Sequence, residues 1–392
     1  MRELDRTKYD VFVVSPRNYF VFTPLLASTS VGSLEFRCVT EPVRGYSKDI
    51  TYHQASCDDI DLDNKVIHCV NQVPNAEEST FTLNYDTLVI GVGSYSNTFG
   101  IPGVKENACF LKDVQDARKI RRRLIECLTD SQKRDKLHFV VVGCGATGIE
   151  FSAELHDFIS SDVSRLYPDL VPLTKMTLYD VAPQILSGFD SQLSEYAHQQ
   201  FDRKGIQIKT QRHVENVQQN KLMIRDEGEV PFGLLVWSTG LMQNPLVAKL
   251  GVAKDSKNQR ILTDSNLQVL DYANVPYPDV YAVGDCATID NHDLPLTAQV
   301  ANQKAIYLTL NRKSSTSPGF KFKDRGMMAY IGSAEALVDM SSVHQGAKNS
   351  GHLAWLLWRS AYFSMSMSIR NKLLIPYYWL LTWSFGRDIS RF

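Results

Sequence analysis

The sequence lacks the patterns that mark several common classes of site. Its seven cysteines are irregularly spaced and form no CxxC or CxxxxC pair, which argues against a zinc site or a redox dithiol and for reduced, structural thiols. No apolar stretch reaches the roughly 18–20 residues that a membrane-spanning helix needs. The formal net charge is −1, so the chain has no overall electrostatic attraction for nucleic acid. Neither a signal peptide nor a DxDxDG calcium-binding loop is visible.

What the sequence does contain is an alternation of strand-like and helical stretches. We expect strands at residues 9–14, 87–92, 137–142, 174–179, 234–238 and 279–283. Apolar residues at helical spacing fill 113–128 and 147–159. This alternation predicts an α/β fold with a mostly parallel sheet covered by helices, and 392 residues suffice for two or three domains. The segment KSSTSPG at 313–319 predicts a surface linker.

The stretch VVVGCGATGIEFSAEL contains the most informative motif. An apolar strand leads into the turn Gly143-Cys144-Gly145-Ala146-Thr147-Gly148, and a helix follows. In a GxGxxG turn the first glycine allows the tight bend, the second lets the backbone approach a pyrophosphate, and the third lets helix and strand pack closely. The helix N-terminus offers free N–H groups to the phosphates. The alternative is a glycine-rich turn that binds nothing.

An acidic residue at the end of the next strand would complete a dinucleotide site. KMTLYD places Asp180 there, where its carboxylate can accept hydrogen bonds from the adenosine ribose and repel a 2′-phosphate, which favours NADH over NADPH. The spacing between the glycine turn and Asp180 exceeds the usual ~20 residues, and we assign the excess to a surface insertion around Ser160–Thr174. A solvated acid at the strand end is the alternative. Glu150 and Glu154 share one helix face, where both are solvated or one approaches the nicotinamide.

A second nucleotide site is indicated by glycines and an acid elsewhere in the chain. In VYAVGDCA, Asp285 follows a strand and a glycine, where it can bond a flavin ribityl hydroxyl or N-cap a following helix. In DTLVIGVGSYSNTFGIPG, a strand leads into Gly91 and Gly93, which could lie against an adenosine. WSTG ends at Gly240, near the nicotinamide-binding part. One nucleotide domain is thus interrupted by a complete second one, as in flavoproteins with two dinucleotide-binding domains.

Eight motifs along residues 4–392 belong together: SPRNYFVFTPLL, NTFGIPG, FVVVGCGATGIEFSAELHDF, VYAVGDCA, LTAQVANQ, AYIGS, LLWRSAY and YWLLTWSFGRDISRF. With them the sequence resembles the type II, or alternative, NADH:ubiquinone oxidoreductases, especially the mitochondrial ones of fungi and plants. The resemblance implies FAD in the first domain, NADH in the inserted one, and a C-terminal segment at the membrane surface. It implies non-electrogenic transfer of a hydride from NADH to FAD and of two electrons to ubiquinone.

The resemblance also implies roles for individual residues. Contacts with FAD are expected from Ser15, Pro16, Arg17, Pro24, Gly93 and Asp285. Contacts with NADH are expected from Gly143, Gly145, Ala146, Thr147, Gly148, Asp180 and Gly240. Gln299 and Gln303 are four apart on one side of a helix, and the resemblance places them beside the flavin ring and the quinone headgroup. Glu150 is the third candidate catalytic residue, as the acid of its helix face that approaches the nicotinamide. Solvent-exposed helix polarity is the alternative for the two glutamines. No metal is expected, and we assign no role to Lys304.

The first domain departs from the family pattern at its start. The GxGxxG between a first strand and a first helix is absent, because Leu4 and Tyr9 resemble the end of that helix and the entry to strand two. We expect that about 30 residues of the domain are lacking, including the central strand and the glycines that cradle the FAD pyrophosphate. The alternative to an enzyme is therefore a truncated, flavin-free chain that binds NADH, a membrane or a full-length homologue.

The C-terminal segment is aromatic and basic. Four of the five tryptophans lie in the last 40 residues. The longest apolar piece, Leu373–Trp383, has about eleven residues, too few to cross a ~30 Å hydrocarbon core. Trp and Tyr favour the headgroup zone, and Arg and Lys suit anionic lipid. We expect an interfacial, monotopic anchor; a dimer interface or an ordinary core is the alternative.

The predicted organisation has four parts. An FAD-binding domain occupies 1–112 and 244–312, an NADH-binding domain 113–243, and a membrane-anchoring and dimerisation segment 313–392. The expected fold is α/β, with two nested Rossmann-like domains of the FAD/NAD-linked reductase type. The expected partners are ubiquinone, the membrane surface and a second copy of the chain, without nucleic acid. The expected location is the mitochondrial inner membrane, peripherally bound.

Overall fold

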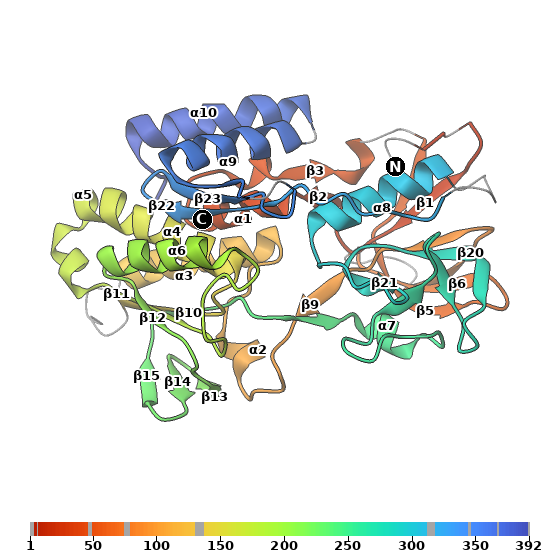
Figure 1. The fold of residues 1–392 in the computed structure, drawn as a ribbon, viewed down its shortest axis with the longest axis horizontal. Coiled ribbons are helices and arrows are strands. Elements are labelled where there is room, and N and C mark those ends of the chain that lie inside the picture. Colours follow the sequence, from red (N-terminus) through yellow and green to blue (C-terminus); the bar gives the residue numbers. More distant parts are fainter. Residues whose placement is uncertain are drawn as a thin grey trace. The chain divides into compact units, whose positions relative to one another are not determined.

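The chain folds into two compact units, each assembled from three separate segments (Figure 1). Unit 1 comprises Met1–Phe20, Pro42–Tyr95 and Leu241–Lys323, and unit 2 comprises Val21–Glu41, Ser96–Gly240 and Asp324–Phe392. The computed structural model describes residues 4–5, 7–45, 49–73, 79–129, 137–311, 318–343, 346–366 and 368–390. Most of the expected linker at 313–319 therefore lies outside the described residues.

Unit 2 contains a four-stranded parallel sheet in the order β12-β11-β10-β16. Its strands are β10 (His138–Val142), β11 (Lys175–Tyr179), β12 (Gln207–Lys209) and β16 (Leu234–Trp237). β10 pairs on both sides, and its five residues are all buried. Parallel strands are usually covered on both faces, which is why such strands read as continuous apolar runs. The expected strands at 137–142, 174–179 and 234–238 are confirmed.

The helices of unit 2 pack on this sheet. α3 (Val114–Thr129) contacts β16, α4 (Ala146–Phe158) contacts β10, and α6 (Ser191–Arg203) contacts β12. α6 begins where the side chain of Asp190 accepts a hydrogen bond from the Gln192 N–H, as an N-cap does. Beyond α4 the chain stays helical through a π-helical turn (Ile159–Val163), α5 (Ser164–Leu166) and a 3₁₀ stretch (Pro168–Leu173). This helical excursion occupies the place of the expected insertion.

The rest of unit 2 includes two small antiparallel sheets and the C-terminal helices. One sheet holds β13 (Val214–Gln218), β14 (Lys221–Ile224) and β15 (Gly228–Pro231), and the other holds β22 (Met327–Gly332), β23 (Glu335–Asp339) and β24 (Lys348–Gly351). α9 (His352–Met365) and α10 (Ile369–Phe385) run side by side in Figure 1. α1 (Leu26–Ser30) and α2 (Val104–Asn107) are short.

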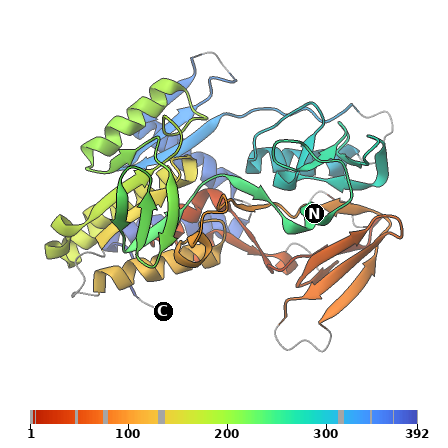
Figure 2. The ribbon, with the colours of Figure 1, turned by 90° about the horizontal axis from the view of Figure 1, so that it is seen from below.

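Unit 1 contains two separate parallel ladders. β1 (Val11–Val14) pairs with β4 (Ile50–His53), and β8 (Leu88–Ile90) pairs with β20 (Pro276–Ala282). β19 (Gln268–Leu270), β18 (Ile261–Thr263) and β21 (Ala287–Ile289) extend the second sheet beyond β20. Figure 2 shows the antiparallel sheet of β5 (Ala55–Asp61), β6 (Val66–Asn71) and β7 (Thr80–Asn84). α7 (Pro245–Lys249) and α8 (Ala298–Asn311) complete the unit.

Two further strand pairs occur where the chain passes between the segments of the two units: β2 (Tyr19–Val21) with β3 (Thr40–Pro42), and β9 (Ser94–Ser96) with β17 (Leu241–Gln243). All seven cysteines are free and all but Cys57 are buried, which confirms their expected structural character. Among the described residues, no helix has the length and apolar character required to cross a bilayer.

Candidate functional site

The GxGxxG turn of unit 2 connects β10 to α4 and has the strained geometry that only glycine permits. Gly143 has φ of +106°, and a Cβ there would lie 2.1 Å from the carbonyl oxygen of Ser238. A Cβ on Gly148 would lie 2.0 Å from the carbonyl oxygen of Gly143. Two of the three glycines are therefore required by the close packing of the chain itself.

Gly145 is different, because nothing lies within 4 Å of the place where its Cβ would be. It is the N-cap residue of α4, and no side chain caps this helix end. Ala146 and Thr147 are exposed with it. The first N–H groups of α4 are thus left open to solvent beside a position without a side chain, which suits an anionic group such as a pyrophosphate.

Asp180 lies next to this turn, directly after β11. Its Oδ2 accepts a 2.5 Å hydrogen bond from the Cys144 N–H, and its Oδ1 accepts one of 2.8 Å from the Ala182 N–H. The parallel pairing of β10 with β11 sets this contact, since the Gly143 N–H also bonds the Tyr179 carbonyl. Each carboxylate oxygen keeps a lone pair for a ribose hydroxyl.

Glu150 lies one turn further along α4 and is partly buried. Its Oε1 accepts hydrogen bonds from the Tyr330 N–H at 3.2 Å and from Nε1 of Trp358 at 3.3 Å. Burial raises the pKa of Glu150 to about 8, because removing the carboxylate from water costs more than these two bonds return. The carboxyl group is therefore a proton holder near neutral pH.

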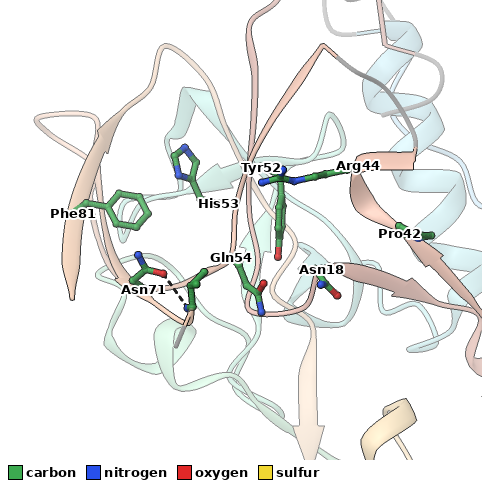
Figure 3. Close-up of a pocket in the computed structure, with 9 residues that line it drawn as sticks. Asn18, Pro42, Arg44, Tyr52, His53, Gln54, Asn71 and Phe81 are labelled. Atoms are coloured by element: carbon green, nitrogen blue, oxygen red, sulfur yellow. Dashed lines mark hydrogen bonds between the residues drawn. The ribbon is translucent and has the colours of Figure 1, made fainter. Parts of the chain in front are cut away.

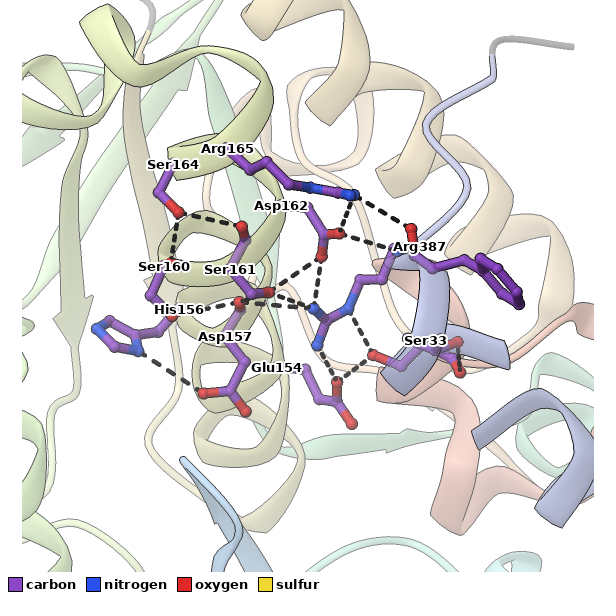
Figure 4. A network of polar contacts seen from close by, with 12 residues as sticks. Ser33, Glu154, His156, Asp157, Ser160, Ser161, Asp162, Ser164, Arg165 and Arg387 are labelled. Carbon is purple, nitrogen blue, oxygen red and sulfur yellow. Dashed lines mark hydrogen bonds and ion pairs between the residues drawn. The ribbon is translucent and has the colours of Figure 1, made fainter. Parts of the chain in front are cut away.

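Glu154, four residues on, also points inward (Figure 4). It is 7% exposed and accepts 2.6 Å hydrogen bonds from the hydroxyls of Ser28 and Ser33. Arg387 from the C-terminal segment lies 3.7 Å from its Oε2. The interpretation of Glu150 and Glu154 as solvated surface acids is wrong, because segments distant in sequence cover this face of α4.

In unit 1, Asp285 lies within a 3₁₀ turn, Gly284–Cys286, that is followed by β21. Its Oδ2 accepts a 2.9 Å hydrogen bond from the Ser94 hydroxyl. The N-cap alternative for Asp285 is wrong, since no side-chain cap forms there and α8 begins only at Ala298. Gly93 has φ of +68° with nothing within 4 Å of a Cβ position, so its backbone is open to approach.

The residues after β1 lie at the carboxyl end of the β1–β4 ladder, where α/β sheets bind ligands. The Ser15 N–H bonds the His53 carbonyl, and the Ser15 hydroxyl accepts the Arg17 N–H at 3.2 Å. Pro16 and Arg17 are exposed. Pro24 and Gly240 belong to unit 2: Pro24 is the second residue of the turn Thr23–Leu25, and the Gly240 carbonyl accepts the Asn97 N–H.

A cavity of about 390 Å³ opens beside the end of β4 (Figure 3). Asn18, Pro42, Arg44, Tyr52, His53, Gln54, Asn71, Val73 and Phe81 line it. The guanidinium of Arg44 lies 5.8 Å from the Tyr52 ring centroid, and His53 lies 5.1 Å from the Phe81 ring centroid. Sequence reasoning missed this cavity because no motif marks its residues.

The two glutamines of α8 do share one face of the helix. Nε2 of Gln303 lies 3.4 Å from Oε1 of Gln299. Gln303 also bonds the backbone of Lys323 in both directions, at 2.8 and 3.0 Å, so it is not free helix-surface polarity. Lys304 beside it is 1% exposed, and burial lowers the pKa of its ammonium to about 8.

These residues fit the two expected dinucleotides unequally. For NADH, unit 2 supplies an uncapped helix N-terminus, the open Gly145 and the adjoining Asp180. For FAD, unit 1 supplies Asp285 and the open backbone at Gly93, which suit the sugar and polar parts. Among the described residues of unit 1 no GxGxxG turn occurs, and the motif at 143–148 belongs to unit 2.

The motifs AYIGS, LLWRSAY and YWLLTWSFGRDISRF contain Tyr330, Trp358 and Arg387, for which the sequence alone predicted no role. The structure assembles all three residues around α4. The motifs themselves could be recognised in the sequence, but their spacing does not show that these three residues come together in space.

Comparisons with known proteins agree with this geometry. Residues 1–305 match the family Pyr_redox_2, described as pyridine nucleotide-disulphide oxidoreductase, and residues 325–388 match the NDH2 C-terminal domain. A probable NADH dehydrogenase of Dictyostelium discoideum is 42% identical over 411 residues, covering 100% of this chain and 88% of that protein. An internal alternative NAD(P)H-ubiquinone oxidoreductase A1 of Solanum tuberosum is 39% identical, with 100% and 85% covered.

A solved structure is similar over nearly the whole length. The NDH2 of Plasmodium falciparum in complex with NADH superposes with a TM-score of 0.90 at 26% identity, covering 99% of this chain and 96% of that one.

The chain therefore belongs to the pyridine nucleotide-disulphide oxidoreductases, a family of α/β enzymes with nested dinucleotide-binding domains. Within that family it belongs to the type II NADH dehydrogenases, which the matched C-terminal domain and the relatives identify. This membership confirms the sequence-based resemblance, the predicted fold class and the expected cofactors, FAD and NADH. It also makes the chain an oxidoreductase.

Proposed function

We propose that this chain oxidises NADH and reduces ubiquinone without moving protons across a membrane. The observation that supports this most directly is the open Gly145–Thr147 turn beside Asp180, in a chain whose relatives are named NADH-ubiquinone oxidoreductases. FAD, when bound, supplies a two-electron relay between nicotinamide and quinone.

In this proposal the residues of unit 2 bind and orient NADH. The N–H groups at the start of α4 bind the pyrophosphate, Asp180 binds the adenosine ribose, and Gly240 flanks the nicotinamide half. Glu150 holds a proton near the reacting groups, because burial keeps its pKa near 8. Gln299 and Gln303 of unit 1 orient the acceptor side with their amides.

The C-terminal helices would bring the chain to the membrane surface of its acceptor. α10 exposes Ile369, Leu373, Tyr377, Leu380 and Trp383, at 80, 69, 54, 58 and 84%. No acidic residue occurs from Gly351 to Gly386, so this surface is apolar and basic. Such a face suits the headgroup zone of a bilayer, here the mitochondrial inner membrane. Membrane binding through this face is compatible with a homodimer.

The test combines turnover and proton measurement. The purified chain, supplied with FAD, is reconstituted with liposomes that contain ubiquinone and an enclosed pH-sensitive dye. We expect NADH-dependent reduction of the quinone with no pH change inside the vesicles beyond that of a leak control. Oxidation of NADH only by oxygen, or a sustained proton gradient, would contradict the proposal.

A further inference from the structure

Two cysteines of unit 1 lie opposite each other in the antiparallel sheet of β5, β6 and β7. In the pairing of β5 with β6, Cys57 is the cross-strand partner of Cys69, and both thiols are free. In the sequence, residues 58–68 separate them, a spacing that matches no dithiol motif. The hairpin alone brings the two cysteines together, so cysteine spacing could not predict this pair.

The backbone hydrogen bonds show what kind of pair this is. The Asn71 N–H donates to the Ser79 carbonyl, next to β7, whereas the N–H of the following residue, Gln72, donates to a carbonyl next to β5. Successive residues of a strand direct their backbone groups to opposite sides, so the N–H of Cys69, two residues before Asn71, faces β7. Cys57 and Cys69 therefore form a non-hydrogen-bonded pair.

A non-hydrogen-bonded pair has the spacing that a disulfide needs. The Cα atoms of such a pair are about 4.5 Å apart, and its side chains come closer than those of a hydrogen-bonded pair. Disulfides join cysteines whose Cα atoms are about 4.4–6.8 Å apart. The register of β5 against β6 also shifts between Cys57 and Asp59, as in a β-bulge, which adds local twist. The backbone can thus accept a bridge without unpairing the strands.

The two side chains face the same apolar cluster. Cys69 is 1% exposed and belongs to this cluster, together with Ile60 and Val252, and the partly buried Cys57 packs against it. The Cys57 thiol donates to the Asp59 carbonyl at 3.4 Å. Rotation about the Cα–Cβ bond of Cys57 would give up this weak contact and turn its sulfur toward Cys69.

We propose that Cys57 and Cys69 are an oxidation site of unit 1, a dithiol that a hydroperoxide converts into a cross-strand disulfide. Phe81 of β7 pairs with Cys69 from the other side and, with Asn71 of β6, lines the cavity of Figure 3. The bridge therefore stiffens a sheet that contributes to the wall of this cavity. The inference concerns unit 1 alone and depends on neither NADH oxidation nor quinone reduction.

The less buried cysteine, Cys57, reacts first. Its sulfur attacks one oxygen of the hydroperoxide, which gives a sulfenic acid and releases an alcohol, or water from hydrogen peroxide. The Cys69 sulfur then displaces the sulfenic oxygen as water, so two thiols lose two electrons and two protons in forming one S–S bond. Burial raises the pKa of Cys57 to about 12 and also raises that of Cys69, so both thiols remain protonated near neutral pH and the reaction there is slow.

The test maps the bridge in the purified full chain. The chain is incubated overnight with excess hydrogen peroxide at pH 8.5, where more of each buried thiol is ionised, and the remaining thiols are blocked with N-ethylmaleimide. Trypsin cleaves after Lys65, between the two cysteines, so mass spectrometry without reduction detects the bridge as two joined peptides. We expect that Cys57 is joined to Cys69, that dithiothreitol separates them, and that hydrogen exchange in β5 and β6 slows at least tenfold after oxidation.

Variants of single cysteines identify the sulfurs involved. Cys57→Ser should abolish both the joined peptides and the slower exchange while the chain keeps its fold, because the hydroxyl replaces a thiol that is only partly buried. Cys286→Ala is the matched control, since Cys286 belongs to the same apolar cluster and its loss should leave the bridge intact. Cys69→Ser should behave as Cys57→Ser does; if its buried hydroxyl prevents folding, Cys57→Ser decides alone.

Three results would overturn the proposal. Peroxide could oxidise Cys57 to a sulfinic acid while Cys69 remains a free thiol, which would show that the two sulfurs do not meet. A disulfide could form with Cys286 or between two chains instead. Both thiols could stay reduced while glutathione in the same solution is fully oxidised to its disulfide.

Discussion

Arg387 donates a 2.8 Å hydrogen bond from Nη1 to Oδ2 of Asp162, across 225 residues of sequence (Figure 4). The same guanidinium bonds the hydroxyls of Ser33 and Ser161, each at 2.9 Å, and lies near Glu154. The side chains of Asp162 and Arg387 are 3% and 10% exposed. One arginine thus neutralises two buried acids and fixes the C-terminal segment to the helix that carries Glu150.

Removing this arginine should destabilise unit 2. Arg387→Met removes the buried cation beside Asp162 and Glu154 and leaves Asp162 only the exposed Arg165, and breaking a buried pair in this way costs about 3–5 kcal/mol of unfolding free energy. Urea denaturation followed by circular dichroism measures the loss. Arg165→Met is the matched control, because Arg165 reaches Asp162 at 3.7 Å but is 57% exposed, and it should cost no more than about 1 kcal/mol. Equal losses for both variants would contradict the role of Arg387.

Two glycines of the same turn should respond differently to added side chains. Gly145→Val places its side chain in open space, so the fold should keep its stability while NADH binding weakens at least tenfold. Gly148→Ala puts a Cβ against the Gly143 carbonyl and should instead destabilise the fold by about 1–3 kcal/mol. Calorimetric NADH titration and thermal unfolding separate the two effects. Unchanged NADH affinity in Gly145→Val would argue against a pyrophosphate at this turn.

Asp180 should determine the preference between NADH and NADPH. Asp180→Asn keeps an acceptor oxygen for the turn but removes the charge that repels a 2′-phosphate, so the preference for NADH should fall. The ratio of kcat/KM for the two substrates measures this. Glu215→Gln, at an exposed carboxylate of the same unit, is the control and should leave the ratio unchanged. A ratio that is the same in Asp180→Asn and the wild type would exclude this role.

Glu150 should make stability depend on pH. Its pKa rises from the ordinary 4.5 to about 8 in the fold. Between these values the native state binds a proton that the unfolded state does not, so stability falls as pH rises, by up to about 1.4 kcal/mol per pH unit. Glu150→Gln mimics the protonated form and should flatten this fall between pH 5 and 8.

Denaturant midpoints across that pH range provide the measurement for Glu150→Gln. Glu229→Gln, at an exposed ion pair with Lys221, is the control and should retain the wild-type slope. If the wild type and both variants showed the same change of stability between pH 5 and 8, Glu150 would not be the group that holds the proton.

The exposed face of α10 should govern membrane binding. Replacing Leu373 and Leu380 together by Asp puts charge into this face and should release the chain from liposomes containing anionic lipid. Co-sedimentation measures the bound fraction. Leu166→Asp, at a leucine outside the C-terminal helices that is 44% exposed, is the control and should stay bound. Release of both variants alike, or of neither, would contradict an anchor on α10.

Short-range patterns in the sequence were sufficient for the local elements. The strands at β10, β11 and β16, the helices α3 and α4, and the turn at 143–148 were predicted within one or two residues. Each depends on apolar periodicity or glycine spacing over fewer than 20 residues, which a linear sequence records directly.

Only the tertiary structure decided which distant side chains meet. The partners of Glu150 lie 180 and 208 residues away, and Arg387 lies 225 residues from Asp162, so no periodicity could connect them. The inward orientation of Glu154 likewise depends on which surfaces pack against α4. Strand pairing and side-chain burial depend on how the whole chain folds, because the free energy of a strand edge or a buried carboxylate depends on its neighbours in space.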